Sequence, residues 1–345
     1  MAVTLADVFY TVLFPGSGRG PVRRPLSRSI RWLFRRTRRL PKGRRQRLLA
    51  YAGPAEVTLT LLSWFVLLLA GWAAIYHPAL GGPVTAAQGA TDQSWGTAVY
   101  FSGYNLTTLG LGDLVATTPA YRVLVVVEAG TGFTTFTLAI SYFVSVYGTL
   151  AGRNSFAMAL HDRSRGTGHG STIVAALWAE GPVAATVDLH SMAAGLRELV
   201  QTHSSYPVLR SFHYQREYDA LPRMLLTCWE TATLLRTTVD VRDGSRPELT
   251  GSDVAEIEVA ATTMTERVTG SGPGDVPTPD EEQLERWRRH HQRMERDLHA
   301  AGVPLLSGAT DRYLAARARW DPRLSHLAHR LMYDWPDHLQ PGPGS

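Results

Sequence analysis

The sequence predicts an all-α membrane protein in which two transmembrane helices flank a short re-entrant helix with its loop, followed by a cytoplasmic α-helical domain. Three observations predict this architecture. Two long apolar runs, Val57–Tyr76 and about residues 123–147, are each long enough to cross a bilayer. A shorter apolar stretch between them is too short to cross. The polar remainder of the chain has apolar positions at helical spacing.

The first apolar run and the basic residues that precede it predict how the chain is oriented in the membrane. Its twenty residues, at about 1.5 Å each, match the roughly 30 Å of a hydrocarbon core. Thirteen Lys and Arg residues lie between Arg19 and Arg47, and no Asp or Glu lies between Asp7 and Glu56. Because positive charge stays inside, residues 1–54 form a cytoplasmic N-terminal arm. We therefore expect a multi-pass plasma-membrane protein with both termini in the cytoplasm.

Four arginines of the arm recur every three or four residues around an apolar face, which predicts an interfacial helix on the anionic inner leaflet. A voltage-sensing helix fits less well, because three earlier spans would have to precede it. Nucleic-acid binding is not needed to explain the cluster, and no nucleic-acid partner is expected. The expected lipid-contact residues are Arg28, Arg31, Arg35 and Arg38.

The short apolar stretch, residues 95–106, is predicted to be the re-entrant helix, with Asp92 or Ser94 as its N-cap. The partial negative charge at the C-terminal end of such a helix favours a cation bound there. The run Thr-Thr-Leu-Gly-Leu-Gly-Asp follows at residues 107–113. Its glycines can adopt positive φ, so successive carbonyls can point to one side.

On this run, residues 56–152 resemble the pore domain of the potassium channel superfamily, and especially the bacterial two-transmembrane channels. The resemblance implies an ion channel pore domain at 55–152 whose filter binds potassium, the permeant ion, with no organic cofactor. Four copies are implied, because one loop cannot encircle an ion. The implied ion-binding residues are Thr108, Leu109, Gly110, Leu111 and Gly112.

The resemblance also assigns residues that support the filter, with departures from the family pattern. Leucine stands at 109 for valine and at 111 for tyrosine, and Tyr104 stands where many bacterial channels have glutamate. Glu128 is the only ionisable residue in 123–147; it is either a functional carboxylate or, as we favour, a group hydrogen-bonded behind the filter to Tyr104 or the pore helix. The predicted support residues are Thr107, Asp113, Tyr100, Phe101, Tyr104 and Glu128.

Gly132 aligns with the gating-hinge glycine of the family, although close helix packing explains a small residue there equally well. A hinge at Gly132 predicts an inner gate at the cytoplasmic mouth. The residues expected to converge there are Tyr142, Val146 and Leu150.

The rest of the chain is predicted as a linker (153–170), a cytoplasmic helical domain (171–269), a second linker (270–279) and C-terminal helices with a tail (280–345). Helical spacing predicts helices at about 171–179, 183–202, 219–239, 251–268 and 279–300. No nucleophile and base occur together, so no enzyme is expected. No metal is expected beyond potassium; the histidines weighed for one and interpreted as solvated or capping are His290, His291, His326 and His329.

The predicted function is a homotetrameric cation channel that favours potassium. The alternative is a membrane-anchored helical signalling or scaffold protein with a non-conducting pore-like domain, which the intact threonines and glycines of the filter run disfavour. The helical domain either assembles the channel or gates it in response to a ligand.

Overall fold

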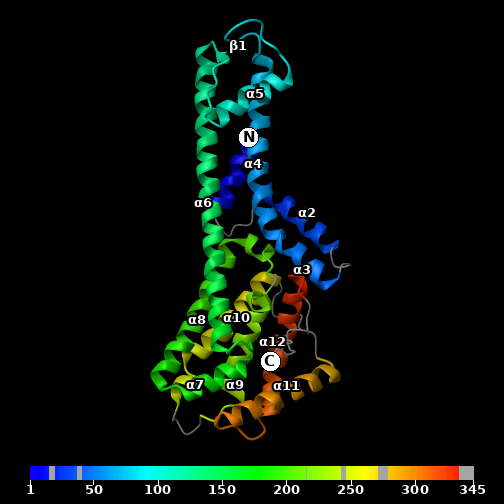
Figure 1. Cartoon of the computed structure of the whole chain (residues 1–345), viewed down its shortest axis with the longest axis vertical. Coiled ribbons are helices and arrows are strands. Elements are labelled where there is room, and N and C mark those ends of the chain that lie inside the picture. Colours follow the sequence, from blue (N-terminus) through cyan, green and yellow to red (C-terminus); the bar gives the residue numbers. More distant parts are fainter. Residues whose placement is uncertain (15–19, 37–40, 215, 242–245, 271–278, 334–345) are drawn as a thin grey trace. The chain divides into compact units, whose positions relative to one another are not determined.

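The computed structural model describes residues 1–14, 20–36, 41–214, 216–241, 246–270 and 279–333. The chain divides into two compact units (Figure 1). The membrane unit comprises Met1–Pro41, Tyr51–Gly148 and Ser205–Leu209, and the helical unit comprises Lys42–Ala50, Thr149–Ser204 and Arg210–Ser345.

The membrane unit is built on two long apolar helices, α4 (Ala52–Tyr76) and α6 (Pro119–Arg163), the second of which continues into the helical unit. Both are long and apolar enough to cross a membrane. The short helix α5 (Trp95–Leu106) lies between them (Figure 1). A 3₁₀ turn, η3 (His77–Ala79), follows α4. The predicted all-α membrane fold with a re-entrant helix is confirmed.

Helix α5 begins and ends where the sequence predicts. The Ser94 hydroxyl accepts a hydrogen bond from the Thr97 amide at 3.3 Å and so caps the helix. The Asp92 carboxylate accepts hydrogen bonds at 2.6 Å from the hydroxyls of Ser94 and Thr97. At the other end the Thr107 hydroxyl donates to the Gly103 carbonyl at 2.8 Å. Both expected capping residues therefore take part.

A two-stranded antiparallel sheet, which the sequence did not predict, lies at the end of the filter run. Strand β1 (Val84–Ala86) precedes α5 in the chain, and β2 (Leu114–Ala116) directly follows the run. The Ala87 amide also donates to the Asp113 carbonyl at 2.8 Å. The loop after α4 is thus attached to the residues that follow the filter run.

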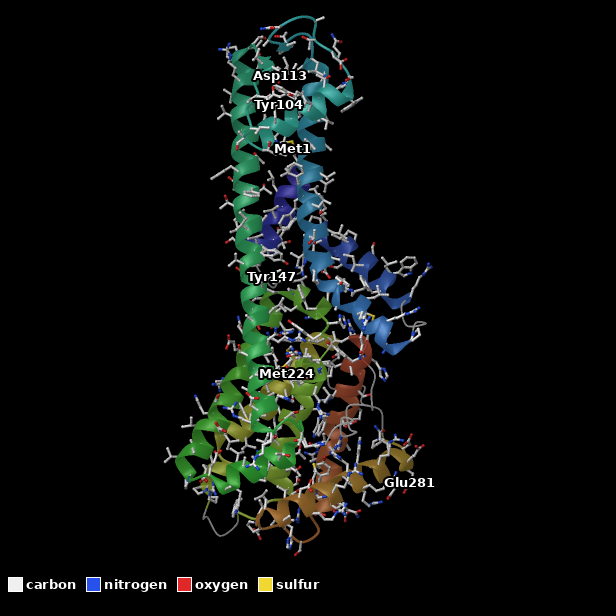
Figure 2. All side chains as sticks on the ribbon, in the orientation of Figure 1. Met1, Tyr104, Asp113, Tyr147, Met224 and Glu281 are labelled. Carbon is white, nitrogen blue, oxygen red and sulfur yellow. The ribbon has the colours of Figure 1, made fainter. Side chains whose placement is uncertain are left out.

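The N-terminal residues, part of the predicted cytoplasmic arm 1–54, pack in the same compact unit as α4. Helix α1 (Ala2–Val8) and the π-helical turn η1 (Phe9–Leu13) belong to the membrane unit. Met1 lies beside Gly71 of α4 (Figure 2). The carboxylate of Asp7 is fully buried and accepts hydrogen bonds from the Trp64 indole at 2.6 Å and from the Val22 amide at 2.7 Å. This buried carboxylate holds α1 against α4.

The predicted interfacial helix is α2 (Arg23–Arg35). Arg28 and Arg31 are exposed on it, together with Trp32. On its other face Ser27 donates a hydrogen bond to the buried Glu56 carboxylate at the start of α4. The Arg35 side chain and Arg38 lie outside the described residues.

The helical unit is a bundle around α9 (Leu221–Thr237), whose residues are almost all buried. Its core includes the stacked indoles of Trp229 and Trp320, 5.4 Å apart. Its helices are α3 (Lys42–Ala50), α7 (Gly170–Ala179), α8 (Pro182–Ser205), α9 (Leu221–Thr237), α10 (Ser252–Thr269), α11 (Glu281–Ala300) and α12 (Ala309–Arg330). Short 3₁₀ turns occur at Pro207–Ser211 (η4), Glu217–Asp219 (η5) and Pro247–Thr250 (η6).

The boundaries of the helical unit differ from the predicted segments. Helix α6 continues to Arg163, so the first part of the predicted linker 153–170 is helical. No glycine or proline interrupts this part, and Ala157 and Leu160 are buried in the core of the helical unit. Residues of α11 and α12 join the same core as those of 171–269. Residues 271–278 of the predicted second linker, and the tail after Tyr333, lie outside the described residues.

The expectation that His290 and His291 are solvated or capping residues is wrong. They are 5% and 0% exposed. A ring nitrogen of His290 lies 2.6 Å from the Glu230 carboxylate, and a ring nitrogen of His291 lies 2.9 Å from the Thr238 hydroxyl. Burial lowers the pKa of His291 to about 4, so this imidazole is neutral at physiological pH. Both polar partners come from positions far away in sequence.

Candidate functional site

The filter run has an alternating backbone. Thr108, Gly110 and Gly112 have φ of +59°, +60° and +80°, whereas the two leucines between them have negative φ. Alternation between positive and negative φ allows successive carbonyls to face one side of the chain. The conformation costs little at glycine but roughly 1–2 kcal/mol at an L-residue such as Thr108. A non-glycine residue held in this region is typical of a functional site.

Tyr104 fastens the re-entrant helix to the residues after the filter run. Its hydroxyl donates to the Leu114 carbonyl at 2.6 Å, and its own carbonyl accepts from the Leu109 amide at 2.7 Å. Tyr104 and Asp113 lie at the same end of the membrane unit (Figure 2). The Tyr104 hydroxyl thus ties α5 to the start of β2, directly after residues 107–113.

We predict that Tyr104→Phe destabilises the filter region by about 1 kcal/mol, because the Leu114 carbonyl loses its hydrogen bond inside the protein. Thermal unfolding of the purified protein, followed with and without potassium, measures the effect. Tyr51→Phe is the matched control, since its ring is 68% exposed and lies away from the filter run. An equal loss of stability in both variants would contradict a specific role for Tyr104.

The two aromatic residues predicted to support the filter have different surroundings. Tyr100 interacts through its hydroxyl with the Asp113 carboxylate at the end of the run. Phe101 is 1% exposed and packs edge-on against Tyr76 of α4, with ring centres 4.8 Å apart. Tyr100 therefore contacts the filter run directly, whereas Phe101 seats α5 against the outer helix.

Glu128 is fully buried on α6 and accepts a hydrogen bond from the Ser102 hydroxyl of α5 at 2.6 Å. Its other carboxylate oxygen has no hydrogen-bond partner within the described part of the chain. The Tyr76 side chain also interacts with this carboxyl group. Glu128 is thus hydrogen-bonded to the re-entrant helix, as expected. The Tyr104 hydroxyl, the other expected partner, donates instead to the Leu114 carbonyl.

Gly132 of α6 lies against Leu106, the last residue of α5. A Cβ atom added there would lie 1.9 Å from the Leu106 carbonyl oxygen and 2.8 Å from its carbonyl carbon. These are backbone atoms, which cannot rotate away. Helix α6 runs through Gly132 without a break. Of the two interpretations of Gly132, a gating hinge and close helix packing, this geometry supports close packing.

A cavity of about 660 Å³ lies directly beneath the filter run. Its lining is largely apolar, and Thr107 and Thr108 form its upper wall. Other lining residues include Trp64, Leu68, Leu106, Thr135, Phe136 and Ile140. The space therefore reaches from the filter threonines down between α4 and α6.

The residues predicted to converge at an inner gate are buried inside the chain. Tyr142, Val146 and Leu150 are 3%, 0% and 5% exposed. Tyr142 packs against Trp64 of α4, with ring centres 6.4 Å apart. Because these side chains pack within their own chain, the expectation that they line the mouth of a pore is not met. Val144, 62% exposed, and Tyr147 lie on the open face of α6 at the same level.

Sequence reasoning missed several residues of this site, of which Ser102, Leu106 and Leu114 matter most. The sequence could have predicted the role of Ser102, because a hydroxyl in an apolar re-entrant helix needs a buried hydrogen-bond partner and Glu128 is the available carboxylate. The other two act through backbone carbonyls, for which side-chain patterns carry no signal.

Two apolar helices around a capped re-entrant helix, followed by a backbone of alternating φ, define the architecture of a pore-loop membrane channel domain. Residues 62–148 match the family model described as "Ion channel". Residues 62–148 are thus similar to an ion channel family, as the resemblance predicted.

A relative supports the assignment to membrane proteins. The "Uncharacterized membrane protein YdjJ" of Bacillus subtilis (strain 168) is 32% identical over 219 residues, which is 63% of this chain and 61% of that protein. The aligned region is longer than 62–148 and therefore extends beyond the channel segment. It spans less than two thirds of the relative. No solved structure matches the chain.

Proposed function

We propose that four copies of this chain form a potassium-selective channel. The observation that carries the proposal is the alternating φ of Thr108–Gly112, held at the end of a capped re-entrant helix. Such a backbone presents carbonyl oxygens that replace the hydration shell of a cation. Conduction requires several sites of moderate affinity, which a run of successive carbonyls offers.

The exposed surface of the run supports a tetramer. The side chains of Leu109 and Leu111 are 65% and 53% exposed in a single chain, which is unfavourable for large apolar groups. A ring of four runs covers these side chains with neighbouring copies and encloses the ion. Along the open face of α6, Thr134, Thr137 and Ser141 recur at helical spacing and supply the polar lining of a water-filled cavity.

The basic segment after Arg19 supports a cytoplasmic location for α2 and for the helical unit. Exposed arginines beside Trp32 and Leu33 suit a helix at the surface of anionic lipid. The helical unit then serves assembly or gating on the cytoplasmic side of the plasma membrane.

Neutralising Arg28, Arg31, Arg35 and Arg38 together is predicted to weaken membrane association of the basic segment by about 1 kcal/mol per residue near the surface. The measurement is binding of a 20–50 peptide to vesicles with and without anionic lipid. The four-alanine peptide should bind anionic vesicles much more weakly and neutral vesicles unchanged. Equal affinity of the parent peptide for both vesicle types would exclude the lipid role.

Flux assays with purified protein in liposomes test the proposal. Potassium should leave protein-containing liposomes, and native mass spectrometry should give four chains per particle. The scaffold alternative predicts no flux above that of empty liposomes. A dimeric particle or the absence of flux would each overturn the channel proposal.

A further inference from the structure

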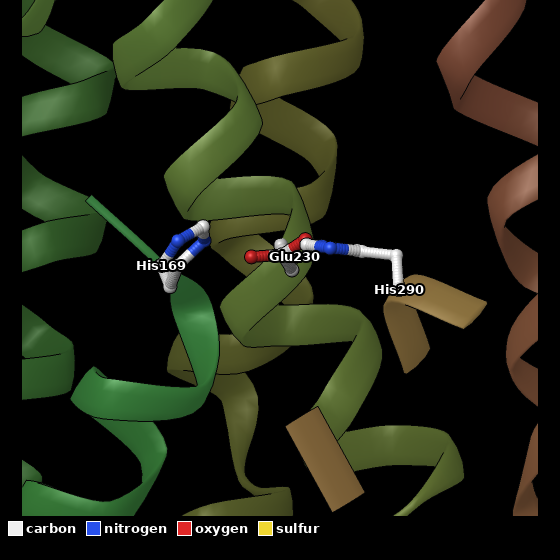
Figure 3. A group of neighbouring side chains, drawn as sticks. All are labelled: His169, Glu230 and His290. Carbon is white, nitrogen blue, oxygen red and sulfur yellow. The ribbon is translucent and has the colours of Figure 1, made fainter. Parts of the chain in front are cut away.

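The helical unit contains a cluster of three potential metal ligands that come from three separate segments of the chain. His169 directly precedes α7, Glu230 lies in the middle of α9, and His290 lies on α11 (Figure 3). One ligand atom from each lies within 4.8 Å of the others. The carboxylate lies between the two imidazoles (Figure 3).

We propose that His169, Glu230 and His290 bind a Zn²⁺ ion that fastens α7 and α11 to α9. Two imidazoles and a carboxylate are a ligand set that zinc prefers, with a fourth position left for water. Two ligand atoms on a tetrahedral zinc ion are about 3.4 Å apart, so the ion replaces the 2.6 Å contact between His290 and Glu230 and moves these two side chains slightly apart. The proposal is independent of potassium conduction.

The surroundings hold each ligand in place. The Gly170 amide donates to one Glu230 oxygen at 2.8 Å, which positions the neighbouring His169 beside that oxygen. His290 lies 2.6 Å from the other oxygen. The Arg317 guanidinium is 3.6 Å from Glu230, and its charge is balanced by an ion pair with Asp321 at 2.9 Å. Such outer contacts orient metal ligands.

The His169 ring is the accessible side of the cluster. Among the described residues no hydrogen bond holds the His169 ring. Because His169 is only half-buried, an ion can enter from its side.

The loop that carries His169 is itself fixed to α9. The Arg223 side chain donates to the Thr167 carbonyl at 3.0 Å, and the Thr227 hydroxyl donates to the Gly168 carbonyl at 3.0 Å. A Cβ atom at Gly170 would lie 2.7 Å from the Thr231 amide. The start of α7 is therefore pressed against the helix that carries Glu230.

Isothermal titration of the full-length, metal-free protein in detergent, with its affinity tag removed, tests the site. We expect one Zn²⁺ per chain, and at least about tenfold weaker binding in His169→Gln and His290→Gln. His326→Gln is the matched control, because this histidine is exposed and outside the cluster, and it should bind zinc like the parent. Excess Mg²⁺ should not displace the ion, since it prefers oxygen ligands.

A second measurement does not depend on variants that fold poorly. Co²⁺ added to the parent protein should give the visible ligand-field absorption of nitrogen coordination, and Zn²⁺ should abolish it. Zinc should also raise the unfolding temperature of the parent but not of His169→Gln. Absence of both the absorption and saturable zinc binding, or parent-like affinity in both histidine variants, would show that the cluster is a buried hydrogen-bonded group only.

Discussion

Gly110→Ala is expected to abolish ion flux without loss of the tetramer. Gly110 has φ of +60°, a conformation that costs an L-residue roughly 1–2 kcal/mol. Alanine therefore favours rotation of the adjoining peptide, which turns a carbonyl away from the ion in all four copies. A Cβ atom at this position meets no heavy atom of the described residues within 4 Å, so we expect the fold itself to be preserved.

The matched control for this variant is Leu109→Val, one residue away. Leu109 has negative φ, and valine keeps a branched apolar side chain there, so flux should persist. Flux from liposomes and the mass of the particle are measured for both proteins. Conductance at the parent level in Gly110→Ala, with an intact tetramer, would remove this residue from the filter.

Gly132→Ala is expected to impair both stability and conduction. The added methyl would overlap the Leu106 backbone, and overpacking of this kind costs about 1–3 kcal/mol or more. Since Leu106 ends the helix that leads into the filter, displacing it moves Thr107 and Thr108. We expect a lower unfolding temperature and loss of most of the flux.

Gly130→Ala separates packing from bending at this position. No heavy atom lies within 4 Å of the added Cβ, and alanine stabilises a helix by roughly 1 kcal/mol relative to glycine. This variant should conduct and unfold at the parent temperature or above. If Gly132→Ala instead kept the parent stability and changed only the open probability in single-channel recordings, the hinge interpretation would be correct.

The sequence predicted those helices that are determined by their own residues, such as a cap or an apolar run. Helix α5 has a cap at Ser94 and a polar run at its end, and it was placed correctly at residues 95–106. Helix α4 was placed by its uncharged residues. The end of α6 was missed because its apolar run stops near Tyr147, whereas packing against the helical unit's core extends the helix to Arg163.

Features that depend on distant residues were not predicted. The Asp7 carboxylate and the Trp64 indole are 57 residues apart in sequence, and their hydrogen bond places α1 beside α4. His290 was assigned to the surface because its partner, Glu230, is 60 residues away. Tyr142 was assigned to a gate by an alignment that does not record which face of α6 packs against Trp64. Tertiary contacts decide all three cases.

The reversal potential of a planar bilayer that contains the purified protein tests the central claim most directly. With potassium on one side and sodium at equal concentration on the other, carbonyl coordination by Thr108–Gly112 predicts a current whose reversal potential is strongly displaced toward that of a potassium-permeable membrane. Gly110→Ala should carry no current under the same conditions. A parent current that reverses near zero would contradict potassium selectivity, and no current in either direction would contradict the channel itself.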